Sequence, residues 1–375
     1  MSRKVTIAII GDFPIGKIYD KFPDRKSGYP TWLYNLYLGF KEIENFDIHW
    51  IIADKQIKQA ETYHHNNQTF HLIPATRLTI GLYTAYAYNR FRIAQCLKRI
   101  NPDIVHGWGT ERFYSLAAND FKGKTLISVQ GLLIACGQRA KISPFERKHS
   151  LYEKHTLRSA NYITTESGWA ADRVRELAPN ANILHWEYAV EAEFFSIKRN
   201  LDTEPSCILV GTDTPVKNVD FAIKVFSKKK LSHIKLYLAG VEKSKHPDLP
   251  PNIIPLGKLN RADLISYMSR AWGLVHVSLA DTGPTVVKEA RVAGLPVILT
   301  YDCGSKQHVA DGQSGFIISP GDEESLENAV LKITESRQTN IQMGEFEKEK
   351  CQHALSTETM IARIIEIYNS IISVN

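Results

Sequence analysis

Short apolar runs alternate with amphipathic segments along most of the chain. Runs such as VTIAIIG (5–11), DIVHG (103–107) and TLISVQG (125–131) are nearly continuous in apolar character and end at glycine. Such runs are typical of strands that are buried on both faces of a parallel sheet. Between them, apolar residues recur at helical spacing, as they do over 31–40. This alternation predicts an α/β fold in which parallel sheets are covered by helices on both faces.

The alternation lapses once, over 191–205, where the sequence is polar and lacks a sustained period. It then restarts with further short apolar runs, of which 207–211 is the first. We therefore predict two doubly wound Rossmann-like domains, over 1–192 and 193–355. A last amphipathic segment, 356–375, has its apolar residues on one stripe and is expected to pack back on the first domain. Because ligands bind at the carboxyl ends of such strands, we expect the two domains to face a central cleft.

The composition is that of a soluble globular protein, with 43% hydrophobic and 23% charged residues among 375. This length favours two domains over one. The longest apolar run is far shorter than the ~20 residues that a membrane-spanning helix needs. The N-terminus passes directly into a strand pattern and lacks the cleavage site of a signal peptide. Five scattered cysteines without a CxxC pair indicate reduced thiols, so we expect a cytoplasmic protein.

The net charge of +6 is unevenly distributed along the chain. Between 121 and 160, eight lysine or arginine residues are opposed only by Glu146 and Glu153. A second basic and aromatic stretch lies in a predicted helix over 83–100. The ordinary interpretation is a solvated helix face. The sharper one is a surface for an anionic partner, either a phosphate-bearing acceptor or a membrane headgroup, and the latter would place the protein peripherally at the inner face of the membrane. No nucleic-acid partner is expected, because the sequence contains no nucleic-acid-reading module.

One loop matches a phosphate-binding loop in its spacing. Gly11 to Lys17 fits GxxxxGK directly after a strand, but Ile18 stands where that motif has Ser or Thr. The missing hydroxyl is the group that would hold Mg²⁺, and the residues that follow are a poor helix start, although the motif needs a helix dipole at the phosphates. A P-loop nucleotide hydrolase is therefore the less favoured alternative.

The sequence predicts no metal site. No two Asp residues are separated by a single position, so no DxD pair is present to hold a divalent cation on a diphosphate. Neither an HExxH motif nor a cluster of His and Cys ligands occurs. We predict chemistry without a metal or another cofactor, which requires protein groups to neutralise a leaving phosphate.

The most informative stretch runs from Ser278 to Gly312. Asp281 and Glu289 flank Gly283-Pro284-Thr285 in a loop that leads into a helical pattern. This arrangement predicts backbone N–H groups and a helix N-terminus that face a phosphate, with two carboxylates for sugar hydroxyls. Lys217 lies in the loop after the first strand of the second domain and can bring a positive charge to the same place.

In their order and spacing these segments resemble the retaining glycosyltransferases of family 4, which have the GT-B fold. The resemblance covers nearly the whole chain. The similar segments, with the family's motif after each, are Ser27 to Leu36 (Gly-Gly-x-x-Thr), Asn101 to His106 (PDxVH), Leu126 to Gly131 (a strand ending in His-Gly or His-Asp), Tyr188 to Glu191 (Gly-Val-Asp), Gly211 to Lys217 (Gly-Arg…Lys), Asp281 to Glu289 (Glu-x7-Glu) and Ala293 to Val297 (CGxPV).

The resemblance implies an enzyme that moves a sugar from a nucleotide sugar, bound by the second domain, to a saccharide or lipid-linked acceptor on the first, in polysaccharide or glycolipid synthesis. Its implied catalytic residues are Asp281, Lys217 and Gln130. Its implied donor-binding residues are Gly28, Gly211, Thr212, Lys217, Gly283, Pro284, Thr285, Val286 and Glu289, with Glu289 for the ribose and Asp281 for the transferred sugar. The acceptor-side candidates are His106, Gln130 and Arg139.

The sequence departs from the family pattern at several of these positions. Asp281 replaces a Glu, Thr212 replaces an Arg that would contact the diphosphate, and Gln130 replaces a His near the transferred sugar. Ser27 replaces a glycine. The absence of the family's Arg at Thr212 and of its His at Gln130 motivates a further alternative, a non-catalytic GT-B relative that serves as a partner subunit. His106 ends a buried strand, where a hydrogen-bonded core histidine is the more frequent case.

Overall fold

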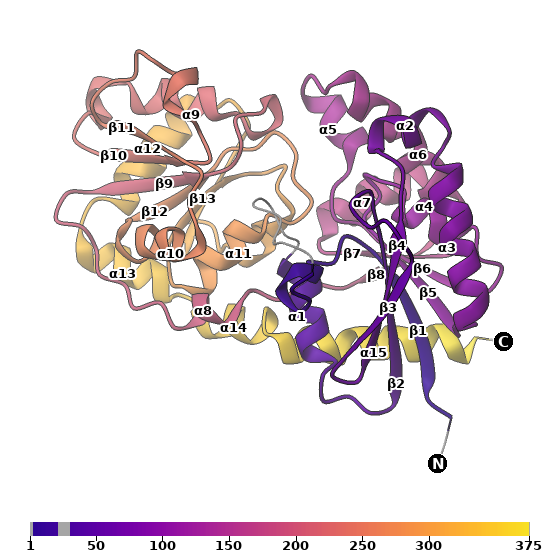
Figure 1. Ribbon diagram of the computed structural model, residues 1–375. Coiled ribbons are helices and arrows are strands. Elements are labelled where there is room, and N and C mark those ends of the chain that lie inside the picture. The colour runs from indigo at the N-terminus through magenta and orange to yellow at the C-terminus, as the bar shows by residue number, and fades with distance from the viewer. Residues whose placement is uncertain (1–2, 22–30, 375) are drawn as a thin grey trace. The chain divides into compact units, whose positions relative to one another are not determined.

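The computed structural model describes residues 3–21 and 31–374, which form two compact units (Figure 1). The first unit comprises the described residues up to Ala135, Ile142–Ala189 and the described residues from Thr357. The second unit comprises Cys136–Lys141 and Val190–Ser356. Each unit is built on its own largely parallel sheet, so the predicted α/β class with two parallel-sheet domains is confirmed.

The sheet of the first unit has the strand order β3-β4-β2-β1-β5-β6-β7-β8 within the described residues. Neighbouring strands are parallel except β3 and β4, which form an antiparallel hairpin at one edge that the sequence pattern did not predict. The strands are β1 (Val5–Ile10), β2 (Phe46–Asp54), β3 (Glu61–His65), β4 (Gln68–Pro74), β5 (Ile104–Trp108), β6 (Lys124–Ser128), β7 (Tyr162–Thr165) and β8 (Asn182–His185).

Helices connect these strands and cover the sheet. In the α6 helix the sequence supplies a complete capping box, because Ser143 and Glu146 each accept a backbone N–H of the other. The helical segments of the first unit are η1 (Ile15–Lys17), α1 (Thr31–Gly39), α2 (Leu78–Tyr83), α3 (Ala87–Ile100), α4 (Tyr114–Asn119), α5 (Leu133–Arg139, whose last residues are grouped with the second unit), α6 (Pro144–Ser159), α7 (Gly168–Leu177) and α15 (Thr357–Ser373).

The single helix predicted over 83–100 is wrong, because the chain breaks between α2 and α3. Ala85 and Tyr86 have φ values of 47° and 56° at the break. The turn buries the Tyr86 ring and brings its hydroxyl within 2.6 Å of His149 Nε2 on α6. This hydrogen bond joins the start of α3 to α6, a contact that apolar periodicity cannot show.

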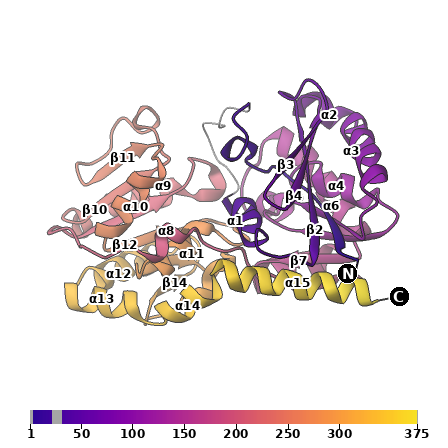
Figure 2. The ribbon, with the colours of Figure 1, turned by 60° about the horizontal axis from the view of Figure 1, so that its bottom comes forward.

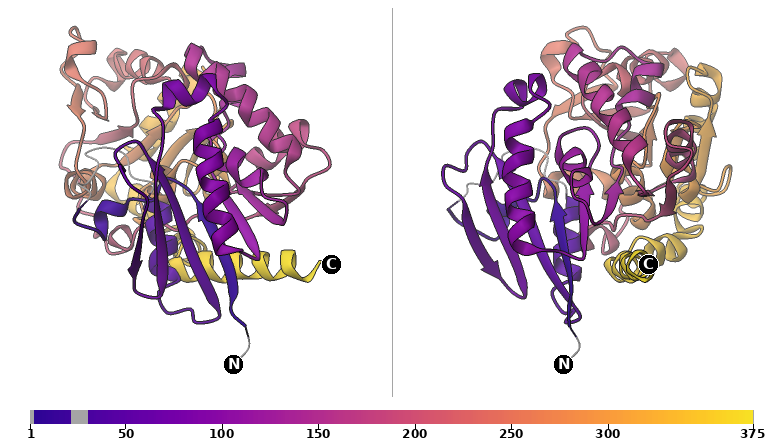
Figure 3. Two further views of the ribbon diagram at one scale, coloured as in Figure 1. Left: turned by 45° about the vertical axis from the view of Figure 1, so that its right-hand side comes forward. Right: turned by 90° about the vertical axis from the view of Figure 1, so that its right-hand side faces the viewer.

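The C-terminal helix α15 completes the core of the first unit (Figure 2). Its stripe of Met360, Ile364 and Tyr368 is buried against the sheet, and Trp186 Nε1 donates a hydrogen bond of 2.9 Å to the Met360 carbonyl oxygen. The right-hand view of Figure 3 shows this helix nearly end-on beside the strands. Burial of these apolar side chains, at about 1.5–3 kcal/mol each, explains why a segment so late in the sequence packs with the first unit.

The second unit has the strand order β11-β10-β9-β12-β13-β14, with all neighbours parallel. Its strands are β9 (Ser206–Val210), β10 (Lys235–Ala239), β11 (Ile253–Gly257), β12 (Gly273–His276), β13 (Val297–Thr300) and β14 (Gly315–Ile318). Its helical segments are α8 (Ala192–Phe195), η2 (Pro215–Lys217), α9 (Val219–Phe226), η3 (Lys229–Leu231), η4 (Lys243–Lys245), α10 (Arg261–Arg270), α11 (Thr285–Val292), η5 (Gly304–His308), α12 (Glu323–Ile333), α13 (Arg337–Glu345) and α14 (Lys348–Ala354).

The polar stretch at 191–205 is more ordered than its sequence indicates. It contains the short helix α8, and the ring of Phe194 in that helix is fully buried in the core of the second unit. Phe195 and Ile197 pack into the same core, but these few apolar residues form no sustained period, so the hydrophobic pattern did not reveal this helix.

Candidate functional site

The strand order of each sheet reverses direction at one point. In the second unit this point lies between β9 and β12, and in the first unit between β1 and β5. The connections that leave the two strands there go to opposite faces of the sheet, so a crevice opens at their carboxyl ends, where open α/β sheets bind ligands. Lys217 follows β9 and Asp281 follows β12, so both lie at the reversal point of the second unit.

Backbone contacts fix the two loops of the second unit against each other. The Leu279 N–H donates to the Val216 carbonyl oxygen at 2.8 Å. The Asp281 N–H donates to the carbonyl oxygen of Asp302 at 3.1 Å, and the Asp281 carbonyl oxygen accepts from the Gly304 N–H at 2.8 Å. The loop after β12 is thereby held between the loops that follow β9 and β13.

The side chains of Lys217 and Asp281 meet as a result. Lys217 Nζ donates a hydrogen bond of 2.5 Å to Asp281 Oδ2, with the two side chains 30% and 14% exposed. His276 Nε2 lies 3.2 Å from the same oxygen, although it is not aligned as a hydrogen bond. The carboxylate thus faces one ammonium group and one imidazole ring.

The charges of this cluster sustain one another. Burial by itself raises the pKa of Asp281, but the charge of Lys217, together with His276, outweighs burial and holds that pKa well below its usual range. Burial lowers the pKa of Lys217, and the Asp281 carboxylate more than offsets this, so the net pKa is raised. Burial also lowers the pKa of His276, which keeps the ring neutral at pH 7. Asp281 and Lys217 are therefore a charged pair, and an incoming anion competes with Asp281 for the ammonium group.

A glycine contact shapes the loop after β9. Gly240 has φ +93°, and a Cβ on it would lie 2.5 Å from the Gly211 carbonyl oxygen. Gly211 in turn lies beneath the side chain of Lys217, whose carbons are 3.7 Å from where a Gly211 Cβ would be. Thr212 is exposed in the same loop. The close approach at Gly240 sets the backbone from which Lys217 projects.

Glu289 lies on α11, four residues after the first residue of this helix, Thr285, and belongs to a second cluster. Arg261 Nη1 donates 2.9 Å to Glu289 Oε1, and Arg261 Nη2 lies 2.6 Å from Glu191 Oε2. Burial raises the pKa of Glu289 to about 7, with Arg261 opposing the shift and Glu191 adding to it. The sequence did not predict that the carboxylate proposed for the ribose is held by an arginine from α10.

The predicted donor-binding loop lies at the start of α11. Pro284 precedes the helix, and Thr285 and Val286 are its first two residues, as the sequence predicts. The first N–H groups of a helix have no partner within the helix and attract anions. Gly283 lies in the loop between Asp281 and this helix start. Gly28, also predicted to bind the donor, lies outside the described residues.

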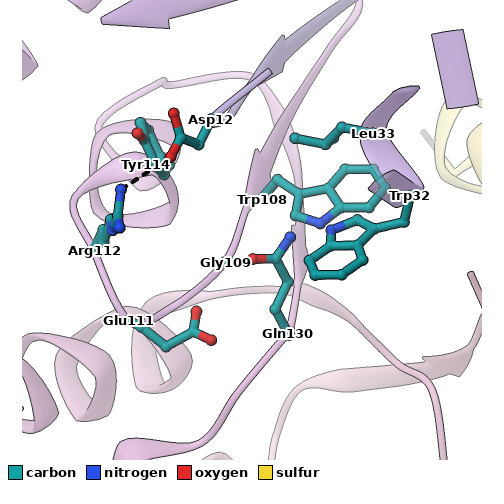
Figure 4. A pocket seen from close by; sticks show the side chains of 9 residues that line it. All are labelled: Asp12, Trp32, Leu33, Trp108, Gly109, Glu111, Arg112, Tyr114 and Gln130. Carbon is teal, nitrogen blue, oxygen red and sulfur yellow. Dashed lines mark hydrogen bonds and ion pairs between the residues drawn. The ribbon is translucent and has the colours of Figure 1, made fainter. Parts of the chain in front are cut away.

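The reversal point of the first unit contains a hollow of about 260 Å³ (Figure 4). Asp12 follows β1, Gly109 and Glu111 follow β5, and Gln130 follows β6, so the lining comes mainly from strand ends. Its described lining residues are Asp12, Trp32, Leu33, Trp108, Gly109, Glu111, Arg112, Tyr114 and Gln130.

Gln130, which the sequence analysis assigned to the acceptor side, lines this hollow. The indole N–H groups of Trp32 and Trp108 both face the end of the Gln130 amide that is drawn as nitrogen in Figure 4. Two donors require an acceptor, so we assign the oxygen to this end, where it lies 2.6 Å from Trp32 Nε1. The amide NH₂ then lies beside Gly109, on the side of Glu111.

The other two acceptor-side candidates do not line this hollow. His106 is fully buried, and its ring nitrogens lie 2.8 Å from the Tyr368 hydroxyl and 2.6 Å from Ser128 Oγ. Burial lowers the pKa of His106 to about 3, so it is a neutral core histidine. Arg139 lies on α5, in the segment grouped with the second unit.

Sequence reasoning missed several polar residues of the two sites. Asp12 belongs to the segment that resembles a P-loop, and no sequence motif marks Glu111, Arg112, Arg261 or His276. Their positions carry a signal nonetheless, since Asp12, Glu111 and Arg112 follow strands that flank the reversal point. Polar residues directly after the strands of a parallel sheet are the pattern that could have found them.

Residues 3–21 and 31–374 contain neither a cluster of metal ligands nor a membrane-spanning helix. No group of three or more His, Cys, Asp or Glu side chains among them is arranged to hold a metal ion. No helix in this part of the chain combines the length and the apolar character needed to cross a bilayer.

Comparisons with known proteins agree with this geometry. The family model of glycosyl transferases group 1 matches residues 191–350. The chain is 21% identical over 294 residues to the GDP-mannose-dependent alpha-mannosyltransferase of Mycobacterium tuberculosis, covering 73% of this chain and 75% of that protein. It is 28% identical over 155 residues to the lipopolysaccharide glucosyltransferase WaaG of Escherichia coli, covering 38% of this chain and 41% of that protein.

The fold is also that of a solved structure. Sucrose-phosphate synthase from Thermosynechococcus elongatus superposes with a TM-score of 0.80 at 14% identity, covering 99% of this chain and 100% of that one. The chain thus has the GT-B fold, as predicted. It is a glycosyltransferase, and its residues 191–350 match the model of the glycosyl transferases group 1. Neither a P-loop hydrolase nor a non-catalytic partner subunit is favoured by these findings.

Proposed function

We propose that this glycosyltransferase transfers a sugar from a nucleotide sugar to a saccharide or lipid-linked acceptor in polysaccharide or glycolipid synthesis, with retention of configuration and without a metal. The observation that carries the proposal is the Lys217–Asp281 pair beside the start of α11. Relatives named as a GDP-mannose-dependent mannosyltransferase and a lipopolysaccharide glucosyltransferase support the donor class and the acceptor class, respectively. Retention rests on the resemblance to family 4.

The donor half of the mechanism follows from charge. As the anomeric bond breaks, negative charge grows on the leaving diphosphate, and fixed positive groups stabilise it. Lys217 and the N–H groups of Thr285 and Val286 are the groups available for this in the second unit. When the ammonium group turns to the phosphate, the Asp281 carboxylate becomes available for a hydroxyl of the transferred sugar. Protein charges thus replace a metal ion, which fits the absence of a DxD pair.

A thermal-shift panel of UDP-, GDP-, ADP- and CMP-linked sugars in EDTA tests the proposal. A ligand at 100 times its Kd stabilises the folded state by about 2.7 kcal/mol, which raises the Tm of a unit of this size by about 5–10 °C. We expect one nucleotide class to do so, and Glu289→Ala to reduce the shift. Glu335→Ala, at an exposed pair with Lys332, is the matched control and should keep it. If no member of the panel shifts the wild-type Tm, the proposal is wrong.

We also propose that the protein is cytoplasmic and binds the inner face of the membrane through an aromatic-basic patch on the first unit. The patch consists of Ile80 and Tyr83 on α2 and Phe145, Lys148 and Leu151 on α6, whose apolar members are 37–78% exposed. Lys148 Nζ lies 4.2 Å from the Tyr83 ring centroid, which joins the two helices at the surface. Apolar side chains beside basic ones suit an anionic bilayer. The cytoplasmic location is supported separately by five free cysteines, which suit a reducing compartment.

Flotation with vesicles tests the aromatic-basic patch. We expect the protein to bind vesicles of phosphatidylcholine with about 30% phosphatidylglycerol. Removing one basic residue should cost on the order of 1 kcal/mol of binding free energy. Tyr83→Ser with Lys148→Glu should therefore reduce binding by more than about 10-fold. Tyr301→Ser with Lys306→Glu is the matched control, because it removes a similar exposed tyrosine–lysine contact from the second unit. Equal loss in both double variants would show that the patch is not the binding surface.

A further inference from the structure

The hollow of the first unit is small and has one aromatic wall. Its volume of about 260 Å³ lies below the range of about 300–1,000 Å³ that is typical of pockets for drug-sized molecules. Trp32 and Trp108 line this side, with Trp108 fully buried and Trp32 partly exposed, and their N–H groups are turned to the Gln130 oxygen. An indole ring offers an apolar face to C–H groups, so the hollow suits one sugar ring better than a longer chain.

The charged groups of the hollow disfavour an anionic ligand. Among its described lining residues the cationic side chain is Arg112, whose Nη1 lies 3.0 Å from Asp12 Oδ2. Because Arg112 pairs with Asp12, the Glu111 carboxyl group has no cation of its own among the described lining residues. A phosphate or carboxylate on the ligand would meet this negative charge, whereas a hydroxyl can donate to it.

Two glycines make room for the Glu111 carboxyl group. A Cβ on Gly131 would lie 2.4 Å from Glu111 Oε1, closer than any real contact. A Cβ on Gly109 would lie 2.9 Å from the Gln130 side chain and 3.1 Å from Glu111 Oε2, and its φ of +87° also favours glycine. The Glu111 carboxyl group and the Gln130 amide therefore lie on the same side of the hollow because neither glycine has a side chain.

The surroundings of Glu111 control its charge. Burial raises its pKa to about 7, while the backbone N–H groups of Glu111, Thr110 and Gly131 and the charge of Arg112 oppose the shift. The titratable groups around it are Arg112, Glu153 on α6 and Tyr188 after β8, with Asp12 beyond Arg112. The pKa of Glu153 is also raised to about 7, by burial first and with Glu111 adding to it.

We propose that this hollow binds one uncharged sugar ring of the acceptor, and that Glu111 determines this specificity by accepting a hydrogen bond from a ring hydroxyl. The inference rests on the proposed function, because it names the chemistry of the acceptor. Gln130 complements Glu111, since its NH₂ donates to a hydroxyl oxygen on the same ring. Trp32 and Trp108 hold the amide in the orientation that this requires.

Acceptor kinetics test the role of Glu111. Because a charge-assisted hydrogen bond is lost, Glu111→Gln is expected to raise the acceptor KM about 10- to 100-fold and to leave the donor KM unchanged. In the wild type the acceptor KM should fall as the pH rises through about 7, where Glu111 ionises, and in Glu111→Gln it should stay flat. Glu176→Gln, at an exposed pair with Arg173, is the matched control and should behave as the wild type.

Binding measured without turnover gives a second readout. Titration with methyl α-glucoside, methyl α-mannoside and methyl β-galactoside should change the tryptophan fluorescence of the wild type with at least one of them. Glucuronate and glucose 6-phosphate should cause no saturable change. Trp32→Phe, which keeps an aromatic wall but loses the N–H to Gln130, should weaken the response and serves if Glu111→Gln fails to fold.

The outcomes separate this inference from the proposed function. An unchanged acceptor KM and pH profile in Glu111→Gln, or saturable binding of the acidic sugars in the hollow, would overturn the role of Glu111. In that case the nucleotide-sugar thermal shift, which reports on the second unit, would remain. Loss of that shift in the wild type would instead count against the proposed function.

Discussion

Lys217→Ala is expected to lower the rate of sugar transfer by about 10²–10³-fold, the usual effect of removing one fixed electrostatic donor. Lys217 is the side-chain cation at the reversal point of the second unit, and Thr212 stands where the related family has a second one. The substitution also leaves the Asp281 carboxylate with only His276 beside it, so the pKa of Asp281 should rise toward its usual range. The measurement is single-turnover transfer at saturating donor.

The double variant shows whether the two residues act as a unit. Asp281→Asn removes the partner of Lys217 while keeping its size, and we expect Lys217→Ala with Asp281→Asn to be no slower than the slower single variant. Lys224→Ala is the matched control, because this lysine lies on the next helix and its side chain, paired with Glu323, is 69% exposed. A folded Lys217→Ala protein that keeps more than about a tenth of the rate would contradict the electrostatic role.

Arg261→Ala is expected to destabilise the second unit by about 3 kcal/mol. Removing one partner of a buried ion pair costs about 3–5 kcal/mol, and the 36% exposure of Arg261 favours the lower end. The loss leaves Glu289 and Glu191 near each other without the guanidinium group that binds both. For a unit of this size the Tm should fall by about 6–12 °C, which thermal unfolding followed by circular dichroism can measure.

The pH dependence identifies the cause of this destabilisation. The pKa of Glu289 is already raised to about 7, and it rises further without Arg261, so at pH 6 the carboxyl group is mostly protonated and carries little charge to repel Glu191. The destabilisation should therefore be smaller at pH 6 than at pH 8, and adding Glu289→Gln should reverse much of it. Arg363→Ala, at an exposed helical pair, should cost less than about 1 kcal/mol at either pH. Equal losses at pH 6 and pH 8 would argue against this explanation.

The local pattern predicted the elements that carry the sites more reliably than the contacts within them. The strand before Lys217 and the helix start at Thr285 were predicted, because an apolar run and a glycine-proline loop are local features. The break at Tyr86 was missed, because it depends on a hydrogen bond to His149, 63 positions later. Helix α8 was missed because it is only four residues long and its buried anchor, Phe194, lies in a polar stretch without a sustained apolar period.

By itself the sequence determined that this chain has two parallel-sheet domains and that Lys217 and Asp281 lie at strand ends, because apolar runs and the residues that end them are properties of neighbouring positions. Only the tertiary structure decided that these two side chains pair, that Arg261 holds Glu289, and that Glu111 lies over Gly131. Each of these contacts joins different elements of the fold. The distances between these side chains depend on strand order and loop packing. Both are set by contacts between residues that lie far apart in the sequence.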